Sequence, residues 1–270
     1  MRTVLLILTL AWAAGLVAMA AYAAAAWPLA SRGRWPEAAL TLGWLAHALT
    51  LALDVFGVGA EVPGARFGFA PALSATVWIV LAVHTVESRL LPLPAVRRVL
   101  ALAGTAVVLL AAVFPGESRP HGGSAWLPLH WLLGVVSYGL LAMAVLHAWL
   151  LDTAERRLRS GAAPAATVAP GAMPLMQLER LTFRFVEIGF IVLTTALLLG
   201  ALMAPGRWEP HKTVFALLGW ATFAVLLGGR HWRGWRGRQA TRWVYSGAVL
   251  LLLAYIGSRF VLEIILRRGG

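Results

Sequence analysis

The sequence predicts an all-α, polytopic integral membrane protein with about eight transmembrane helices. Hydrophobic residues make up 60% of the 270-residue chain, charged residues make up 13%, and the mean hydropathy is +0.78. Ordinary soluble domains carry about 25% charged residues, so a soluble fold could not cover this much apolar surface. In addition, eight apolar stretches approach the ~20 residues that a helix needs to cross a bilayer.

Each predicted span is an apolar run bounded by polar, proline or glycine residues. In chain order the spans are 3–26, 37–56, 70–91, 96–114, 127–151, 185–203, 213–228 and 243–266. The longest connector, "RRLRSGAAPAATVAPGAMP", is rich in alanine, proline and glycine, which predicts a flexible loop. We expect one membrane domain over residues 1–270 and no soluble domain.

The first apolar segment has two interpretations. Arg2, the apolar run and the stretch "AYAAAA" are features of a signal peptide. The apolar run is, however, longer than the ~7–15 residues usual in signal peptides, so we expect a retained helix.

Basic residues at the ends of the spans predict the topology. The net charge is +12, and Lys212 is the only lysine. The loops after the first, third, fifth and seventh spans carry fifteen arginines, whereas the opposite side carries seven basic residues. Because basic loops stay in the cytoplasm, we expect both termini on the outer face of a bacterial inner membrane. The arginines then act as membrane anchors, and nucleic-acid binding is not expected.

His130 opens the fifth span, at the outer membrane–water boundary in this topology. Gly134, Ser137 and Tyr138 follow it on one helix face. Small residues of this kind let another helix, or a flat ligand, approach closely. Two interpretations remain open: a packing seam capped by an interfacial histidine, and an axial ligand for haem iron, which imidazole suits.

The stretch "GRWEPHK" before the seventh span offers further candidates. His211 could supply another imidazole, Lys212 could pair with a haem propionate, and Trp208 could cover a flat ring. The alternative is an ordinary interfacial anchor made of tryptophan and lysine.

Two other ionisable residues lie within predicted spans. His47 is in mid-membrane, where a polar group is costly unless it has a partner. It is therefore either a functional residue or a neutral histidine bonded to a backbone carbonyl. Arg259 and Glu263 are four residues apart on one helix face, which predicts either an intramembrane ion pair or an arginine that binds an anionic ligand.

Four stretches occur in a fixed order: "LPLHWLLGVVSYGLL", "MPLMQLERLTFRFVEIGFIVLTTALLLGAL", "WEPHKTVFALLGWATFAVLL" and "GWRGRQATRWVYSGAVLLLLAYIGSRFVLEIIL". Together they resemble the cytochrome c assembly membrane proteins, in the YpjD-like branch, with a core of about residues 40–266. The resemblance implies a protein that binds or moves haem on the outer face. It also implies that His130 is an axial ligand, with His211 or His47 as the second.

The chain departs from the well-studied members of that family in three places. Their tryptophan-rich WGxxWxWD loop is absent, and "GRWEPHK" stands in its place. Gly228 stands where those members have a histidine, and the chain reads "LRRGG" where they have a second outer histidine. These departures argue against a cytochrome c synthetase.

We therefore expect a haem chaperone or conduit in cytochrome c biogenesis, without a defined reaction. The cofactor would be non-covalent haem b, since the chain has no cysteine for covalent attachment. Lys212 and Arg259 would pair with the propionates, and Trp208 and Tyr138 would line the site. The partners of the protein would be the lipid bilayer, haem and cytochrome c maturation proteins. The alternatives are a permease subunit for another small molecule, and a non-catalytic scaffold or regulator of haem synthesis.

Overall fold

A computed structural model describes residues 2–27, 35–57, 64–89, 94–119, 126–160, 175–203 and 210–265. Within these ranges, eight helices are long and apolar enough to cross a membrane, which confirms the predicted all-α polytopic membrane class. The chain divides into two compact units, residues 1–124 with 259–270 and residues 125–258. Both units consist mainly of membrane helices, so the single membrane domain stays a prediction.

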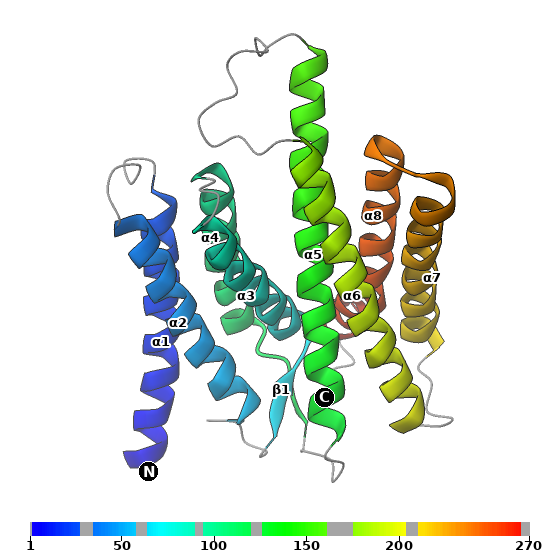
Figure 1. Ribbon diagram of the computed structural model, residues 1–270. Coiled ribbons are helices and arrows are strands. Elements are labelled where there is room, and N and C mark those ends of the chain that lie inside the picture. The colour runs from blue at the N-terminus through cyan, green and yellow to red at the C-terminus, as the bar shows by residue number, and fades with distance from the viewer. Residues whose placement is uncertain are drawn as a thin grey trace. The chain divides into compact units, whose positions relative to one another are not determined.

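The first unit contains four membrane helices and a short β-ribbon. These elements are α1 (Arg2–Ala26), α2 (Trp35–Val55), β1 (Ala65–Phe67), α3 (Phe69–Ser88), α4 (Pro94–Val113) and β2 (Glu117–Arg119). Helix α1 packs on α2 and α4, and α3 packs on α4 (Figure 1). The strands pair antiparallel, with Arg66 opposite Ser118. This ribbon cannot be predicted from the sequence pattern, because three-residue strands are too short to show a two-residue period.

The ring of Tyr22 on α1 lies at the centre of this packing and is fully buried. Two glycines lie against it, Gly43 on α2 and Gly104 on α4. A Cβ added at Gly43 would lie 2.6 Å from the Tyr22 ring, and one added at Gly104 would lie 2.8 Å from it. Both positions therefore need glycine for the three helices to approach this closely.

Trp44 and Trp78 join α2 to α3. Their rings stack with centroids 4.9 Å apart and an interplanar angle of 7°. Each indole N–H also donates to the backbone carbonyl of the other residue, at 3.2 Å from Trp44 and 3.1 Å from Trp78. Because an unpaired N–H is costly in an apolar medium, this reciprocal arrangement satisfies both indoles.

The second unit is a set of four longer helices. They are α5 (Trp126–Arg159), α6 (Leu175–Met203), α7 (Pro210–Arg233) and α8 (Gly237–Leu252), and α8 continues into the π-helical η2 (Leu253–Gly257). Helix α5 packs mainly on α6 and also on α8, and α7 packs on α8 (Figure 1). After η2 come α9 (Ser258–Phe260) and η3 (Val261–Ile265), and residues from Arg259 onward group with the first unit.

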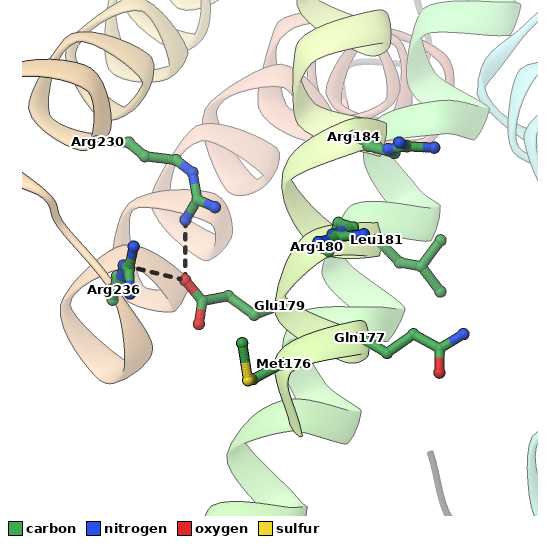
Figure 2. A pocket seen from close by; sticks show the side chains of 8 residues that line it. All are labelled: Met176, Gln177, Glu179, Arg180, Leu181, Arg184, Arg230 and Arg236. Atoms are coloured by element: carbon green, nitrogen blue, oxygen red, sulfur yellow. Dashed lines mark hydrogen bonds and ion pairs between the residues drawn. The ribbon is translucent and has the colours of Figure 1, made fainter. Parts of the chain in front are cut away.

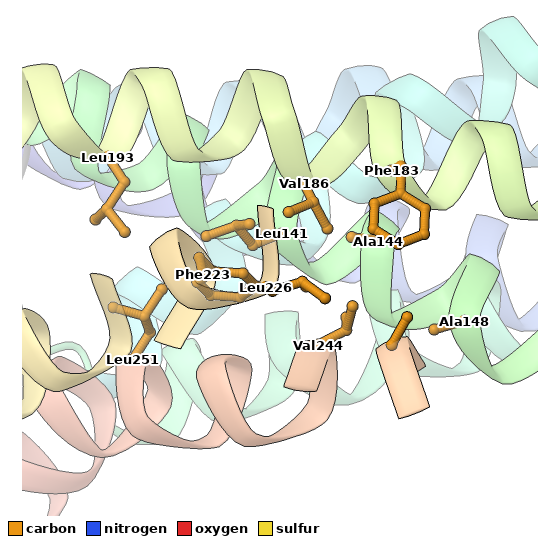
Figure 3. Close-up of a cluster of buried hydrophobic side chains, with 11 residues drawn as sticks. Leu141, Ala144, Ala148, Phe183, Val186, Leu193, Phe223, Leu226, Val244 and Leu251 are labelled. Atoms are coloured by element: carbon orange, nitrogen blue, oxygen red, sulfur yellow. The ribbon is translucent and has the colours of Figure 1, made fainter. Parts of the chain in front are cut away.

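All four helices of the second unit contribute to its apolar core (Figure 3). Phe223 of α7 and Val244 of α8 are fully buried, as is Val186 of α6. The core residues are Leu141, Ala144, Ala148, Phe183, Val186, Leu193, Phe223, Leu226, Ala240, Val244 and Leu251. The packing of this core positions the four helices, and with them the polar side chains at the helix ends.

Four helices extend at least five residues beyond the spans predicted from hydropathy. Helix α5 runs to Arg159 rather than to residue 151, and α6 begins at Leu175 rather than at residue 185. Helix α7 ends at Arg233 rather than at 228, and α8 begins at Gly237 rather than at 243. The added segments are rich in arginine and other good helix formers, so the backbone stays helical after the apolar run ends. Residues 161–174, most of the loop expected to be flexible, lie outside the described residues.

Candidate functional site

His130 lies near the start of α5 and is partly buried. Its Nδ1 is 3.0 Å from the backbone oxygen of Ala196 on α6. A carbonyl oxygen can only accept a hydrogen bond, so Nδ1 carries the proton and donates it. In the neutral imidazole the lone pair is then at Nε2, which is the atom available to a metal.

Two glycines shape the surroundings of this imidazole. A Cβ added at Gly200 of α6 would lie 2.8 Å from Cε1 of His130, so glycine is needed for the ring to approach α6. At Gly134, one helical turn C-terminal to His130, an added Cβ would meet none of the described residues within 4 Å. The predicted smooth stripe is therefore open at Gly134.

The rest of the predicted stripe has structural partners. Ser137 is fully buried, and its hydroxyl donates to the Gly134 carbonyl at 2.7 Å. The Tyr138 hydroxyl donates to the carbonyl of Leu251 on α8, also at 2.7 Å, just before the π-helical turn. Tyr138 therefore joins α5 to α8. As a cofactor-binding residue it stays a prediction, in which its ring rather than its hydroxyl would make the contact.

Lys212 lies at the start of α7, in the same unit as His130. Its Nζ is 5.9 Å from the centroid of the Tyr255 ring, within the range of a cation–π contact. Trp208 lies outside the described residues, as does the side chain of His211. The roles expected for Trp208 and His211 therefore stay predictions.

His47 is fully buried in the first unit, between α1 and α3. Its Nε2 lies 2.8 Å from Oγ of Ser74, and its Nδ1 lies 3.2 Å from the hydroxyl of Tyr22. Of the two interpretations left open for His47, the bond to a backbone carbonyl is therefore wrong, because both ring nitrogens pair with side-chain hydroxyls. Iron could bind either nitrogen only if one of these hydrogen bonds were broken.

Arg259 is buried, with 5% of its surface exposed. Its Nη1 lies 3.5 Å from Oε2 of Glu117 on β2. The side chain of Glu263, its expected partner, lies outside the described residues. Sequence spacing could not reveal Glu117 as a partner, because the two residues are 142 positions apart.

His147 is a buried histidine of α5 that the sequence motifs do not point to. It is 1% exposed, its Nδ1 donates to the Met143 carbonyl at 2.9 Å, and its ring stacks on Phe185 with centroids 5.2 Å apart. It lies about 25 Å from His130 along the helix axis, at 1.5 Å per residue. An imidazole within an apolar span was the signal that could have drawn attention to it.

The described residues hold no group of three or more His, Cys, Asp or Glu side chains that could bind a metal ion. That result concerns ions held entirely by protein ligands. Haem brings four ligands of its own and needs only one or two from the protein. His130 therefore remains the strongest described candidate for a ligand.

Residues 35–266 match the family described as Cytochrome C assembly protein. The chain belongs to this family. It is 32% identical over 160 residues to the inner membrane protein YpjD of Escherichia coli K12, a match that covers 58% of this chain and 60% of YpjD. This confirms the resemblance drawn from the sequence motifs, including its YpjD-like branch.

More distant relatives carry the name cytochrome c biogenesis protein CcsA. The one from Prochlorococcus marinus MIT 9313 is 28% identical over 199 residues, covering 59% of this chain and 62% of that protein. The one from Synechococcus sp. CC9605 is 30% identical over 158 residues, covering 50% and 52%. The chain thus matches less than two thirds of the length of each of these relatives. No solved structure matches the chain.

Proposed function

We propose that this protein holds non-covalent haem b at His130, on the outer face of a bacterial inner membrane. In this role it is a haem chaperone or conduit for cytochrome c biogenesis. The observation that carries the proposal is the hydrogen bond from Nδ1 of His130 to the Ala196 carbonyl, which leaves the lone pair at Nε2. Histidines that ligate metals usually donate their other ring N–H in this way, which fixes the tautomer and the ring orientation.

The residues around His130 fit a flat macrocycle. Gly200 gives the imidazole room against α6, and the helix face at Gly134 is open among the described residues. Haem would supply an iron centre that accepts the Nε2 lone pair, together with two carboxylates that cationic side chains can bind. The protein's part is to orient the imidazole and to leave one smooth helix face beside it.

The remaining candidate ligands differ in how well their contacts suit the role. His211 follows the first residue of α7, in the same unit as His130, and Lys212 is next to it. Both nitrogens of His47 are already hydrogen-bonded. We therefore favour His211 as the second axial ligand and Lys212 as a propionate partner. Arg259 groups with the first unit and pairs there with Glu117, so its role as a propionate partner stays a prediction.

Two further arguments support the location and the pathway. The excess of arginine in alternate loops favours both termini outside, which puts His130 on the outer face. Among the relatives, YpjD is named an inner membrane protein and CcsA a cytochrome c biogenesis protein. The family match covers residues 35–266, which include His130 and the Ala196 carbonyl that accepts its hydrogen bond.

The test is the absorption spectrum of the protein purified in detergent from haem-replete cells. Wild type should show a Soret band with b-type features, and His130→Ala should lose or shift that band while still inserting into the membrane. His231→Ala is the matched control, because this imidazole is exposed at the far end of α7. A wild-type preparation that stays free of haem after haem is added would contradict the proposal. It would favour the permease or scaffold alternatives.

A further inference from the structure

A basic pocket lies in the second unit at the N-terminal end of α6 (Figure 2). Its volume is about 640 Å³. Four arginines and a single glutamate line it, together with one amide and two apolar side chains. The lining residues are Met176, Gln177, Glu179, Arg180, Leu181, Arg184, Arg230 and Arg236. The pocket therefore has a clear excess of positive charge.

Glu179 pairs with Arg230 of α7 and with Arg236, which lies in the connector between α7 and α8. Nη1 of Arg230 on α7 lies 2.9 Å from Oε1 of Glu179, and Nε of Arg236 lies 3.9 Å from the same oxygen (Figure 2). The Arg230 guanidinium also lies 3.4 Å from the centroid of the Phe183 ring. These contacts pair both arginines with the only acidic side chain in the pocket lining, and Arg230 is the more closely held of the two.

Arg180 and Arg184 supply the remaining positive charge. They lie four residues apart on α6, so they project from one helix face. Both are exposed, and no ion pair joins either of them to another of the described residues. One cavity is thus lined by two guanidinium groups that pair with Glu179 and by two that have no ion pair among the described residues. Guanidinium groups suit phosphate because they can form two parallel hydrogen bonds with it.

The helix face that carries these two arginines becomes apolar toward the middle of the membrane. Ile188 and Ile191 follow Arg184 at the fourth and seventh positions, so they share its face. They are 51% and 64% exposed, and Met176 on the pocket wall is 82% exposed. A free anion would use only the arginines. A molecule with an anionic head and acyl chains would use both the arginines and this apolar face.

We propose that the pocket binds the headgroup of an anionic phospholipid. The number of arginines best suits a headgroup with two phosphates, such as that of cardiolipin. Basic pockets between the ends of membrane helices bind headgroups of this kind. The proposal is independent of haem, because Arg180 lies about 24 Å along α6 from Ala196, the residue that contacts His130.

The experiment uses the full chain in detergent, and the probes are cardiolipin, phosphatidylcholine and inorganic phosphate at matched phosphate concentration. Lipid binding is measured by native mass spectrometry, and stability by thermal unfolding. Cardiolipin should bind and raise the melting temperature, whereas phosphatidylcholine and inorganic phosphate should not. The double variant Arg180→Gln/Arg184→Gln should weaken cardiolipin binding about tenfold or more, since each basic residue contributes to holding an anionic lipid.

The matched control is Arg238→Gln/Arg242→Gln. These arginines are also exposed and four residues apart, at the start of α8, but they do not line the pocket. The control should bind cardiolipin like wild type, and both double variants should unfold like wild type without lipid. Equal loss in both variants would overturn the proposal in favour of diffuse surface charge. Equal stabilisation by inorganic phosphate would indicate a free-anion site, and unchanged binding by Arg180→Gln/Arg184→Gln would remove the pocket from lipid binding.

Discussion

The imidazole of His130 donates from Nδ1 to the carbonyl oxygen of Ala196, 3.0 Å away, across the contact between α5 and α6. The acceptor is a backbone atom on a helix, so it cannot rotate away as a side chain could. The direction of the Nε2 lone pair is therefore set by how closely the two helices approach. Residues that control this approach should control ligand binding at His130 without touching the ligand.

Gly200→Ala should disturb the site by this route. The added Cβ would lie 2.8 Å from Cε1 of His130 and would push the imidazole away from α6. We expect a shifted Soret band or weaker haem retention, with normal membrane insertion. Gly15→Ala is the control, because its added Cβ would be 3.9 Å from Thr50, an ordinary contact distance. An unchanged spectrum in Gly200→Ala would show that this approach does not govern the site.

Gly134→Leu tests whether a ligand occupies the open helix face. The described residues leave the position of an added Cβ free, so the ligand-free protein should be no less stable than wild type. Replacing glycine within a helix gains about 1 kcal/mol of helix propensity. If haem lies against this face, the same substitution should weaken haem binding in a titration. Haem affinity equal to wild type would place the ligand elsewhere.

The sequence predicted the membrane class and the approximate spans, because a bilayer imposes an apolar length that hydropathy detects directly. It did not predict the helix ends, since arginine-rich segments such as the start of α8 remain helical outside the apolar run. Nor did it predict the pairing of β1 with β2, which joins residues far apart in the chain.

The candidate site could also be predicted only in part. The position of His130 at the start of a span could be predicted from the sequence, and so could that of Gly134, one turn C-terminal to it. The carbonyl of Ala196 could not, because it depends on the register of α6 against α5. From the sequence alone, the arginines near the start of α6 indicate only membrane anchors. Only the fold shows that Arg180 and Arg230 line one pocket.

His47→Leu should destabilise the first unit without altering bound haem. Its two partners, Tyr22 and Ser74, would each lose a hydrogen bond in an apolar interior, and leaving buried polar groups unpaired costs about 1–3 kcal/mol each. Ser74→Ala removes one of these bonds and should cost less. The measurements are thermal unfolding and the absorption spectrum. A changed haem spectrum in His47→Leu, with Ser74→Ala unchanged, would make His47 a ligand after all.

Glu117→Gln should leave the buried charge of Arg259 without its described acidic partner. Removing one member of a buried ion pair is strongly destabilising, by about 3–5 kcal/mol when both groups are fully buried. Glu117 is 32% exposed, so solvent screening should reduce the cost well below that range. Thermal unfolding should show a lower melting temperature, and Arg259→Met/Glu117→Gln should recover part of it. No recovery in the double variant would mean that the pair contributes little.

The orientation of the chain decides which site faces which compartment. Ala196, which contacts His130, and Arg180 in the basic pocket lie about 24 Å apart along α6, so the two sites lie toward opposite ends of a helix that is expected to span the membrane. The distribution of arginine predicts that His130 faces outward and the pocket faces the cytoplasm. A reporter active only in the cytoplasm should therefore be silent when fused after Gly270 and active when inserted near Gly161. The reverse pattern would invert the topology. It would move the proposed haem site to the cytoplasmic face and the lipid pocket to the outer leaflet.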